Sequence, residues 1–143
     1  MGNKKILIIE DDGDVRLGYH VRLKANNYDT FFAVDAIGSL REARTHQPDL
    51  IILDLGLPGG DGFVVMERLK TNPQLAVIPV IVVSGRGGLA NRTRAVEAGA
   101  KAFFEKPVDN DDLLEAIRKV LGGPVQLGKA EFLPDPKRRK VLL

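Results

Sequence analysis

Side chains with reactive or charged groups follow short apolar runs, directly or within three residues, at four places in the chain: Asp11 and Asp12, Asp54, Ser84, and Lys106. Carboxylates gathered in one pocket repel one another and raise each other's pKa values, so a group of three needs a nearby cation. Carboxylate oxygens suit Mg²⁺, which usually keeps several waters and binds phosphate oxygens as well. Lys106 would add a fixed positive charge. A fold that gathers these residues is suited to placing a phosphoryl group on a carboxylate.

The apolar run before Asp54 is the clearest of these strand signals. Leu50–Leu53 contains four large apolar residues, two of them β-branched, which is typical of a strand buried on both faces. The glycines and the proline in the stretch 56–62 end it abruptly. Asp54 is therefore expected at the carboxyl end of a central strand. Taken alone, it is better explained as a loop cap, and only the other polar residues favour chemistry there.

Hydrophobic periodicity predicts five strands that alternate with five helices. The expected strands span residues 6–9, 29–34, 50–53, 79–84 and 102–105, and the expected helices span about 14–26, 37–45, 63–72, 89–98 and 110–121. This alternation predicts an α/β fold with a doubly wound, five-stranded parallel sheet in a three-layer α/β/α sandwich. All strands of such a sheet end at one edge, where the four polar positions would meet.

Composition is that of an ordinary globular protein. The chain has 143 residues, 44% hydrophobic and 28% charged, with a net charge of +2 that does not indicate nucleic-acid binding. It has no cysteine, which excludes disulfides and thiol catalysis. No apolar run approaches the ~20 residues of a membrane helix, and no signal peptide opens the chain, so we expect a cytoplasmic location. We expect one domain over residues 1–122 and a linker or disordered basic tail over 123–143.

Four motifs in order resemble the receiver domain of bacterial response regulators, which has a flavodoxin-like, CheY-like fold. They are IIEDD at 8–12, LIILDLGLPGGDG at 50–62, VIVVSG at 80–85 and FFEKP at 103–107. Each motif is weak alone, but all four occur on the expected element types. The resemblance covers the chain from Lys4 to about Leu121. It implies a protein of two-component phosphorelay signal transduction.

The resemblance implies a role for each site residue. Asp54 would accept a phosphoryl group from a sensor histidine kinase or a histidine phosphotransfer protein. Ser84 and Lys106 would contact the phosphoryl oxygens, and the peptide bond between Lys106 and Pro107 would be cis. The implied Mg²⁺ ligands are Asp11, Asp12, Asp54 and the backbone carbonyl of Gly56. The protein would not be an enzyme in the usual sense, although it would catalyse its own phosphorylation and dephosphorylation.

A conformational switch is also implied. Ser84 would move toward the phosphoryl group, and Phe103 would turn from solvent into the core. The surface formed by the helix at 89–98, the strand at 102–105 and the last helix would change, and it could form a homodimer. Arg86 would influence the lifetime of the phosphoryl group. Nucleic acid would be bound only through an output domain that these residues do not contain, and no membrane is expected as a partner.

Other interpretations remain open. Glu10, Asp11 and Asp12 could be an acidic cluster at a helix start, and Phe103 could be a core residue in both states. A receiver-like interaction module that is never phosphorylated, or an aspartyl-phosphate phosphohydrolase, would share this topology. Such hydrolases usually carry a second acid two residues after the nucleophile, where this chain has Gly56. A flavodoxin-like cofactor binder is rejected, because Asp11 and Asp12 would repel the phosphate of its cofactor.

Overall fold

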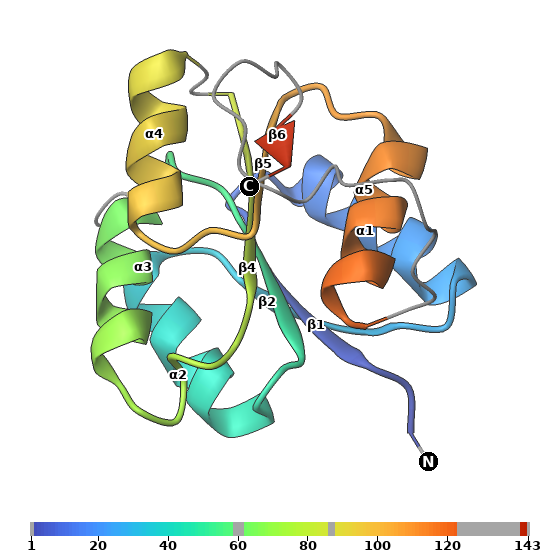
Figure 1. Ribbon diagram of the computed structural model, residues 1–143. Helices are drawn as coiled ribbons and strands as arrows, with labels where there is room; N and C mark the ends of the chain where they lie inside the picture. The colour runs from blue at the N-terminus through green and yellow to red at the C-terminus, as the bar shows by residue number, and fades with distance from the viewer. Residues whose placement is uncertain (1, 59–61, 86–87, 123–140, 143) are drawn as a thin grey trace.

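The computed structural model describes residues 2–58, 62–85, 88–122 and 141–142 (Figure 1). Five parallel strands form one sheet in the order β2-β1-β3-β4-β5. Their bounds are β1 Lys5–Ile9, β2 Asp29–Ala33, β3 Leu50–Leu53, β4 Val80–Ser84 and β5 Ala102–Glu105. The predicted five-stranded, doubly wound sheet is confirmed.

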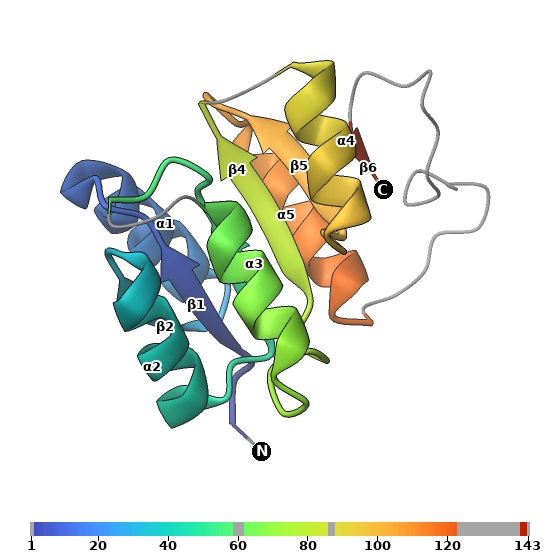
Figure 2. The ribbon, with the colours of Figure 1, turned by 90° about the vertical axis from the view of Figure 1, so that its left-hand side faces the viewer.

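Helices cover both faces of the sheet. Their bounds are α1 Gly13–Ala25, α2 Ala36–His46, α3 Gly62–Thr71, α4 Leu89–Glu97 and α5 Asn110–Val120. Helices α2, α3 and α4 lie on one face, and α1 and α5 lie on the other (Figures 1 and 2). The three-layer α/β/α arrangement is therefore confirmed.

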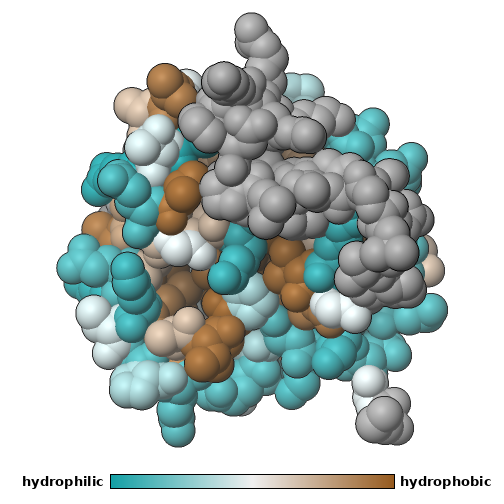
Figure 3. Space-filling model, in the orientation of Figure 1, coloured by the Kyte–Doolittle hydropathy of each residue, from teal (hydrophilic) through white to brown (hydrophobic). Residues whose placement is uncertain are grey.

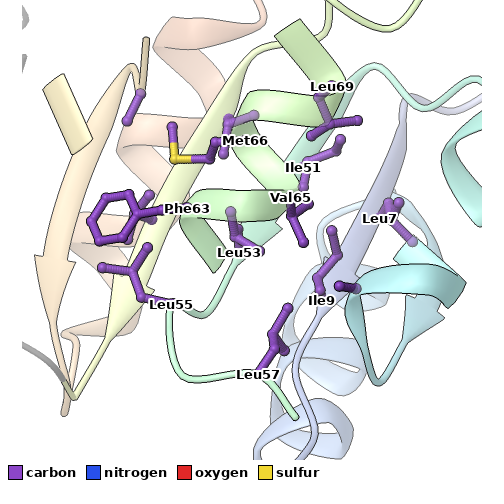
Figure 4. Packing of buried hydrophobic residues seen from close by; sticks show 14 of the residues in the cluster. Leu7, Ile9, Ile51, Leu53, Leu55, Leu57, Phe63, Val65, Met66 and Leu69 are labelled. Carbon is purple, nitrogen blue, oxygen red and sulfur yellow. The ribbon is translucent and has the colours of Figure 1, made fainter. Parts of the chain in front are cut away.

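The two faces explain why the strands are continuously apolar. Along β1, Leu7 and Ile9 pack under α2 and α3, whereas Ile6 and Ile8 pack with α1 and α5. Successive side chains of a strand point to opposite faces, so a strand covered on both sides must be apolar at every position. Figure 4 shows the first of these clusters, in which Phe63 and Met66 of α3 contact the side chains of β3.

Aspartates begin three of the helices. Asp12 caps α1, since its Oδ1 accepts hydrogen bonds from the amides of Asp14 and Val15 at 2.9 and 3.2 Å. The helix therefore begins at Gly13, one residue before the start that the sequence predicted. Asp109 caps α5 in the same way and Asp35 caps α2. Each carboxylate satisfies amides that have no partner within the helix and lies at its positive end.

A sixth strand adds to the predicted sheet. β6, Val141–Leu142, pairs antiparallel with β5 at its outer edge. It falls in the segment predicted as a linker or tail, of which residues 123–140 and 143 lie outside the described residues. In the described part of the chain, no helix is long and apolar enough to span a membrane.

A cavity of about 460 Å³ opens at the amino-terminal end of the sheet, lined by Met66 and Leu69 of α3, the loop before β4, and Lys101. Figure 3 shows hydrophobic residues exposed between hydrophilic ones in the region of α3 and α4. The lining of the cavity includes the first residue of β4 and none of the polar residues that follow the strands. It is therefore separate from the predicted site.

Candidate functional site: a carboxylate cluster at the sheet edge

The pairing of β1 with β3 brings two buried carboxylates side by side. Ile9 pairs with Leu53, and the Asp54 amide donates to the Ile9 carbonyl at 3.0 Å. Glu10 and Asp54 each follow the last residue of their strand, so they leave the sheet at neighbouring points. Strand order reverses between β1 and β3, and ligand sites of open α/β sheets occur at such a switch point.

Asp54 is held by three hydrogen-bond donors from three segments. Its Oδ1 accepts from the Gly56 amide at 3.0 Å and from the Ser84 hydroxyl at 3.2 Å, and its Oδ2 accepts from Lys106 Nζ at 3.2 Å. Only 9% of Asp54 is exposed, and Ser84 is fully buried. Because donors from β4 and β5 fix both oxygens, the plane of the carboxylate is set before any ligand arrives.

Lys106 links the two carboxylates. It follows β5, two strands away from β3, and its side chain extends past β4 to reach Asp54. Its Nζ also lies 2.6 Å from Glu10 Oε1. The peptide bond between Lys106 and Pro107 is cis, as the sequence predicted. The three charges form one hydrogen-bonded group at the carboxyl ends of β1, β3 and β5.

Burial and charge act in opposite directions on this group. Burial raises the pKa of the Glu10 carboxyl above its usual value, although Lys106 and the Asp12 amide oppose this shift. Burial would also raise the pKa of Asp54, but the Gly56 amide, Lys106 and Ser84 hold it below its usual value. Burial would lower the pKa of Lys106, yet Glu10 and Asp54 raise it. The donors around Asp54 thus favour its ionised form.

Asp11 completes a group of carboxylates able to hold a metal ion. One oxygen each from Glu10, Asp11 and Asp54 lies within 4.8 Å of the others. Glu10 and Asp54 are buried and Asp11 is exposed, so the group is open on one side. Hard oxygen donors with space for water are what Mg²⁺ requires. The residues present therefore fit this ion.

Glu10 is the residue that the sequence interpretation missed. The structure brings Asp11 and Asp54 together, as predicted, but it adds Glu10, and the carboxylate of Asp12 caps α1 instead. The missed signal is the strand boundary. Glu10 directly follows the apolar run of β1 just as Asp54 follows that of β3, so parallel pairing puts them next to each other. The ligand role of the Gly56 carbonyl stays a prediction.

A family model described as a response regulator receiver domain matches residues 6–118. The chain belongs to this family. It is 37% identical over 117 residues to the DNA-binding dual master transcriptional regulator RpaA of Synechocystis, covering 82% of this chain and 48% of that regulator. It is 33% identical over 121 residues to sporulation initiation phosphotransferase F of Bacillus subtilis, covering 85% of this chain and 96% of that protein.

Solved structures agree with this assignment. A CheY-like receiver domain protein from Methanospirillum hungatei matches with a TM-score of 0.77 and 30% identity, over 84% of this chain and 94% of that one. The chain spans about half of the regulator RpaA and about a quarter of PleD from Caulobacter vibrioides, to which it is 35% identical over 117 residues, 81% of this chain. These relatives are response regulators of two-component systems, and this chain is a receiver domain of that class.

The two predicted switch residues of this receiver domain lie on neighbouring strands. Val82 pairs with Phe103 across β4 and β5, two residues before Ser84. The Phe103 side chain is fully buried in the cluster beneath α2, α3 and α4, and the Ser84 hydroxyl already contacts Asp54. Phe103 therefore already lies in the inward position predicted for the phosphorylated state, which is also where a residue that stays in the core in both states would lie. Arg86 lies outside the described residues.

A groove runs from the receiver's acidic site along its surface. It has a volume of about 460 Å³ and lies between α1 and the start of α5. Its lining combines apolar and basic residues: Val15, Gly18, Tyr19, Arg22, Lys106, Pro107, Val108 and Asn110. Elsewhere on α1, Leu17 and Val21 are 60% and 61% exposed. The groove therefore reaches Lys106, which pairs with Asp54.

Proposed function

We propose that this receiver domain accepts a phosphoryl group on Asp54 from a histidine of a partner kinase or phosphotransfer protein. One observation carries the proposal: a buried, ionised carboxylate is held by Lys106, Ser84 and the Gly56 amide beside two further carboxylates. A buried structural carboxylate can also accept three donors, but it does not need two further carboxylates beside it, because like charges repel. A phosphoryl acceptor needs both, since it must be aligned with its donor and placed beside a metal ion.

The reaction transfers one phosphoryl group without an external oxidant or proton donor. A carboxylate oxygen of Asp54 forms a bond to phosphorus while the bond from phosphorus to the donor imidazole nitrogen breaks, and its electron pair stays on that nitrogen. Negative charge spreads over the three outer phosphoryl oxygens. Lys106 and Ser84 lie where they can donate to these oxygens once the acyl phosphate forms.

Glu10, Asp11 and Asp54 are the residues that would hold Mg²⁺. When bound, the ion would neutralise charge on the carboxylates and on the phosphoryl oxygens. Glu10 takes the ligand position that the sequence interpretation gave to Asp12. Asp12 would still act indirectly, because its amide donates to Glu10 Oε2 at 3.2 Å and its carboxylate fixes the start of α1.

The donor histidine must come from another protein. His20 Nδ1 lies 2.7 Å from Thr30 Oγ1, and the His46 ring stacks on Phe31 at 3.9 Å between centroids, so both histidines contact β2. The groove between α1 and α5 offers a partner helix apolar contacts within reach of Asp54. On this proposal the chain works in the cytoplasm as a phosphoprotein, catalysing its own modification rather than turning over a substrate.

Phosphorylation by a small donor tests the proposal without knowledge of the partner. The protein is incubated with acetyl phosphate or phosphoramidate, with and without Mg²⁺, and its intact mass is measured. We expect the mass of one phosphoryl group to be added only with Mg²⁺. Catalytic release of product from a generic phosphatase substrate would instead indicate a hydrolase, and no modification under any condition would indicate an interaction module.

A further inference from the structure

Arg16 contacts the backbone of the acidic segment. It lies in the first turn of α1, and its Nη1 donates to the carbonyl oxygens of Glu10 and Asp11 at 2.9 Å each. One guanidinium nitrogen has two N–H groups, so it can serve both carbonyls at once. Two consecutive peptide groups are thereby fixed to the helix that follows them.

The residues fixed in this way carry two of the three clustered carboxylates. The direction of each side chain depends on the orientation of its own backbone. The Asp12 amide is fixed too, by Glu10 Oε2 at 3.2 Å. Each residue between β1 and α1 is therefore held by a hydrogen bond. Arg16 holds the carbonyls of both Glu10 and Asp11, while the Glu10 amide donates to the Ala33 carbonyl at 3.0 Å and its carboxylate accepts from Lys106.

We propose that Arg16 is a positioning residue for the metal site of this receiver domain. Its Nη1 holds the peptides of Glu10 and Asp11 so that their carboxylates meet Asp54, and its guanidinium brings a positive charge near them. The inference rests on the proposed function, because Arg16 can position metal ligands only if the carboxylate cluster binds a metal ion. Residues that orient metal ligands commonly change metal affinity 10–100-fold when replaced.

Two substitutions separate the two hydrogen bonds from the charge. Arg16→Lys keeps a positive charge, but its stem is one bond shorter than the path to Nη1, so we expect its ammonium not to reach both carbonyls. Arg16→Met keeps an apolar stem and removes all donors. If the two hydrogen bonds matter, both variants bind Mg²⁺ more weakly than wild type, by roughly tenfold or more. Arg41→Lys is the matched control, since Arg41 is an exposed arginine on α2.

The measurement is a titration of each protein with Mg²⁺ alone, followed through backbone amide NMR shifts. The spectrum shows at the same time whether each variant is folded. In the metal-free protein, the amides of Asp11 and Asp12 should also exchange hydrogen faster in both Arg16 variants than in Arg41→Lys. A loss of global stability alone would raise exchange throughout the sheet and not selectively in this loop.

Wild-type Mg²⁺ affinity in Arg16→Lys would overturn the proposal, and so would the absence of Mg²⁺ binding in wild type. The proposed function fails by a different result. If wild-type protein binds Mg²⁺ but never gains a phosphoryl group, Asp54 is not an acceptor, whereas weaker Mg²⁺ binding in the two Arg16 variants would still support the role of Arg16.

Discussion

Lys106 Nζ lies 2.6 Å from Glu10 Oε1 and 3.2 Å from Asp54 Oδ2, so one ammonium bridges two carboxylates from different strands. Both carboxylates are nearly buried, and only 26% of the Lys106 side chain is exposed. The lysine therefore offsets one of the two negative charges in the absence of metal. In the proposed reaction it is also the cation nearest to the arriving phosphoryl group.

Lys106→Met should lower the free energy of unfolding by about 3 kcal/mol at pH 7, since it leaves two buried carboxylates without their cation. Without Lys106, the pKa values of Glu10 and Asp54 rise in the folded state. The folded variant then takes up protons more readily than the unfolded chain, so the difference from wild type should shrink as pH falls from 7 to about 5. Urea denaturation at both pH values measures this.

Lys24→Met is the control for the Lys106 variant. Lys24 pairs with Asp29 at 3.4 Å, but its side chain is 61% exposed, so its removal should cost less than about 1 kcal/mol. Mg²⁺ should also restore part of the stability of Lys106→Met. A loss that is the same at both pH values and insensitive to Mg²⁺ would show that the carboxylates are not coupled to Lys106.

Stability should fall above about pH 10 for two reasons. The pKa of Lys106 is raised in the folded protein, so its contribution is complete below 10.5 and is lost as pH rises through the folded value. Burial raises the pKa of Tyr19 from 10.0 to about 12, so the unfolded chain releases this proton first and unfolding is favoured between these values. Tyr19→Phe should make the alkaline loss shallower, by about 1.4 kcal/mol at pH 11.

Tyr28→Phe is the matched control for Tyr19. Burial also raises the pKa of Tyr28, but this ring is less enclosed. Its replacement should therefore reduce the loss of stability at alkaline pH less than Tyr19→Phe does. The measurement is the free energy of unfolding from urea denaturation at pH 8, 10 and 11. If the free energy of unfolding changes with pH in the same way in wild type and Tyr19→Phe, the Tyr19 hydroxyl is not shielded from solvent.

Gly62→Ala should disturb the acceptor loop. A Cβ at Gly62 would lie 2.7 Å from the Asp54 carbonyl oxygen and 2.7 Å from Leu55 Cα, so backbone must move. We expect a loss of about 1–3 kcal/mol and slower phosphorylation of Asp54. Gly18→Ala on α1 meets nothing within 4 Å and should instead stabilise by about 0.5–1 kcal/mol. Both variants are measured by thermal or urea denaturation. If both substitutions change the free energy of unfolding in the same direction, the steric argument is contradicted.

Ser84→Ala should slow phosphorylation roughly tenfold or more, because it removes a buried hydroxyl donor to the reacting carboxylate. Ser84→Thr keeps the hydroxyl and should retain most of the rate. Hydrogen exchange with and without beryllofluoride, a phosphoryl mimic, tests the switch. Changes in protection should extend from β4 to α4 and β5. Changes confined to the Asp54 loop would favour Phe103 as a core residue in both states.

The sequence predicted the fold well, because its apolar runs are short, β-branched and regularly separated by helix patterns. Asp54, Ser84 and Lys106 could be placed for the same reason, since each follows such a run and parallel strands end at one edge. Glu10 was missed because three consecutive acids follow Ile9, and composition alone does not tell which carboxylate turns inward. Strand pairing and the Asp12 cap decide this, and both depend on tertiary contacts.

The contacts of β6 and Arg16 were beyond sequence reasoning for a different reason. Val141 and Leu142 lie in a segment with no periodicity, so their pairing with β5 depends on an edge built by residues 40 positions earlier in the chain. The hydrogen bonds of Arg16 join a side chain to carbonyl oxygens, which every residue possesses. No pattern of residue types identifies such an acceptor.

The most direct test of the account is to locate the phosphoryl group itself. Protein treated with acetyl phosphate and Mg²⁺ is reduced with borohydride, which converts an aspartyl phosphate to homoserine, and is then mapped by peptide mass spectrometry. We predict homoserine at position 54 in wild type and in the control Asp29→Asn, and no modification in Asp54→Asn. Homoserine at another aspartate in wild type, or one phosphoryl group still gained by Asp54→Asn, would contradict the assignment of Asp54 as the acceptor.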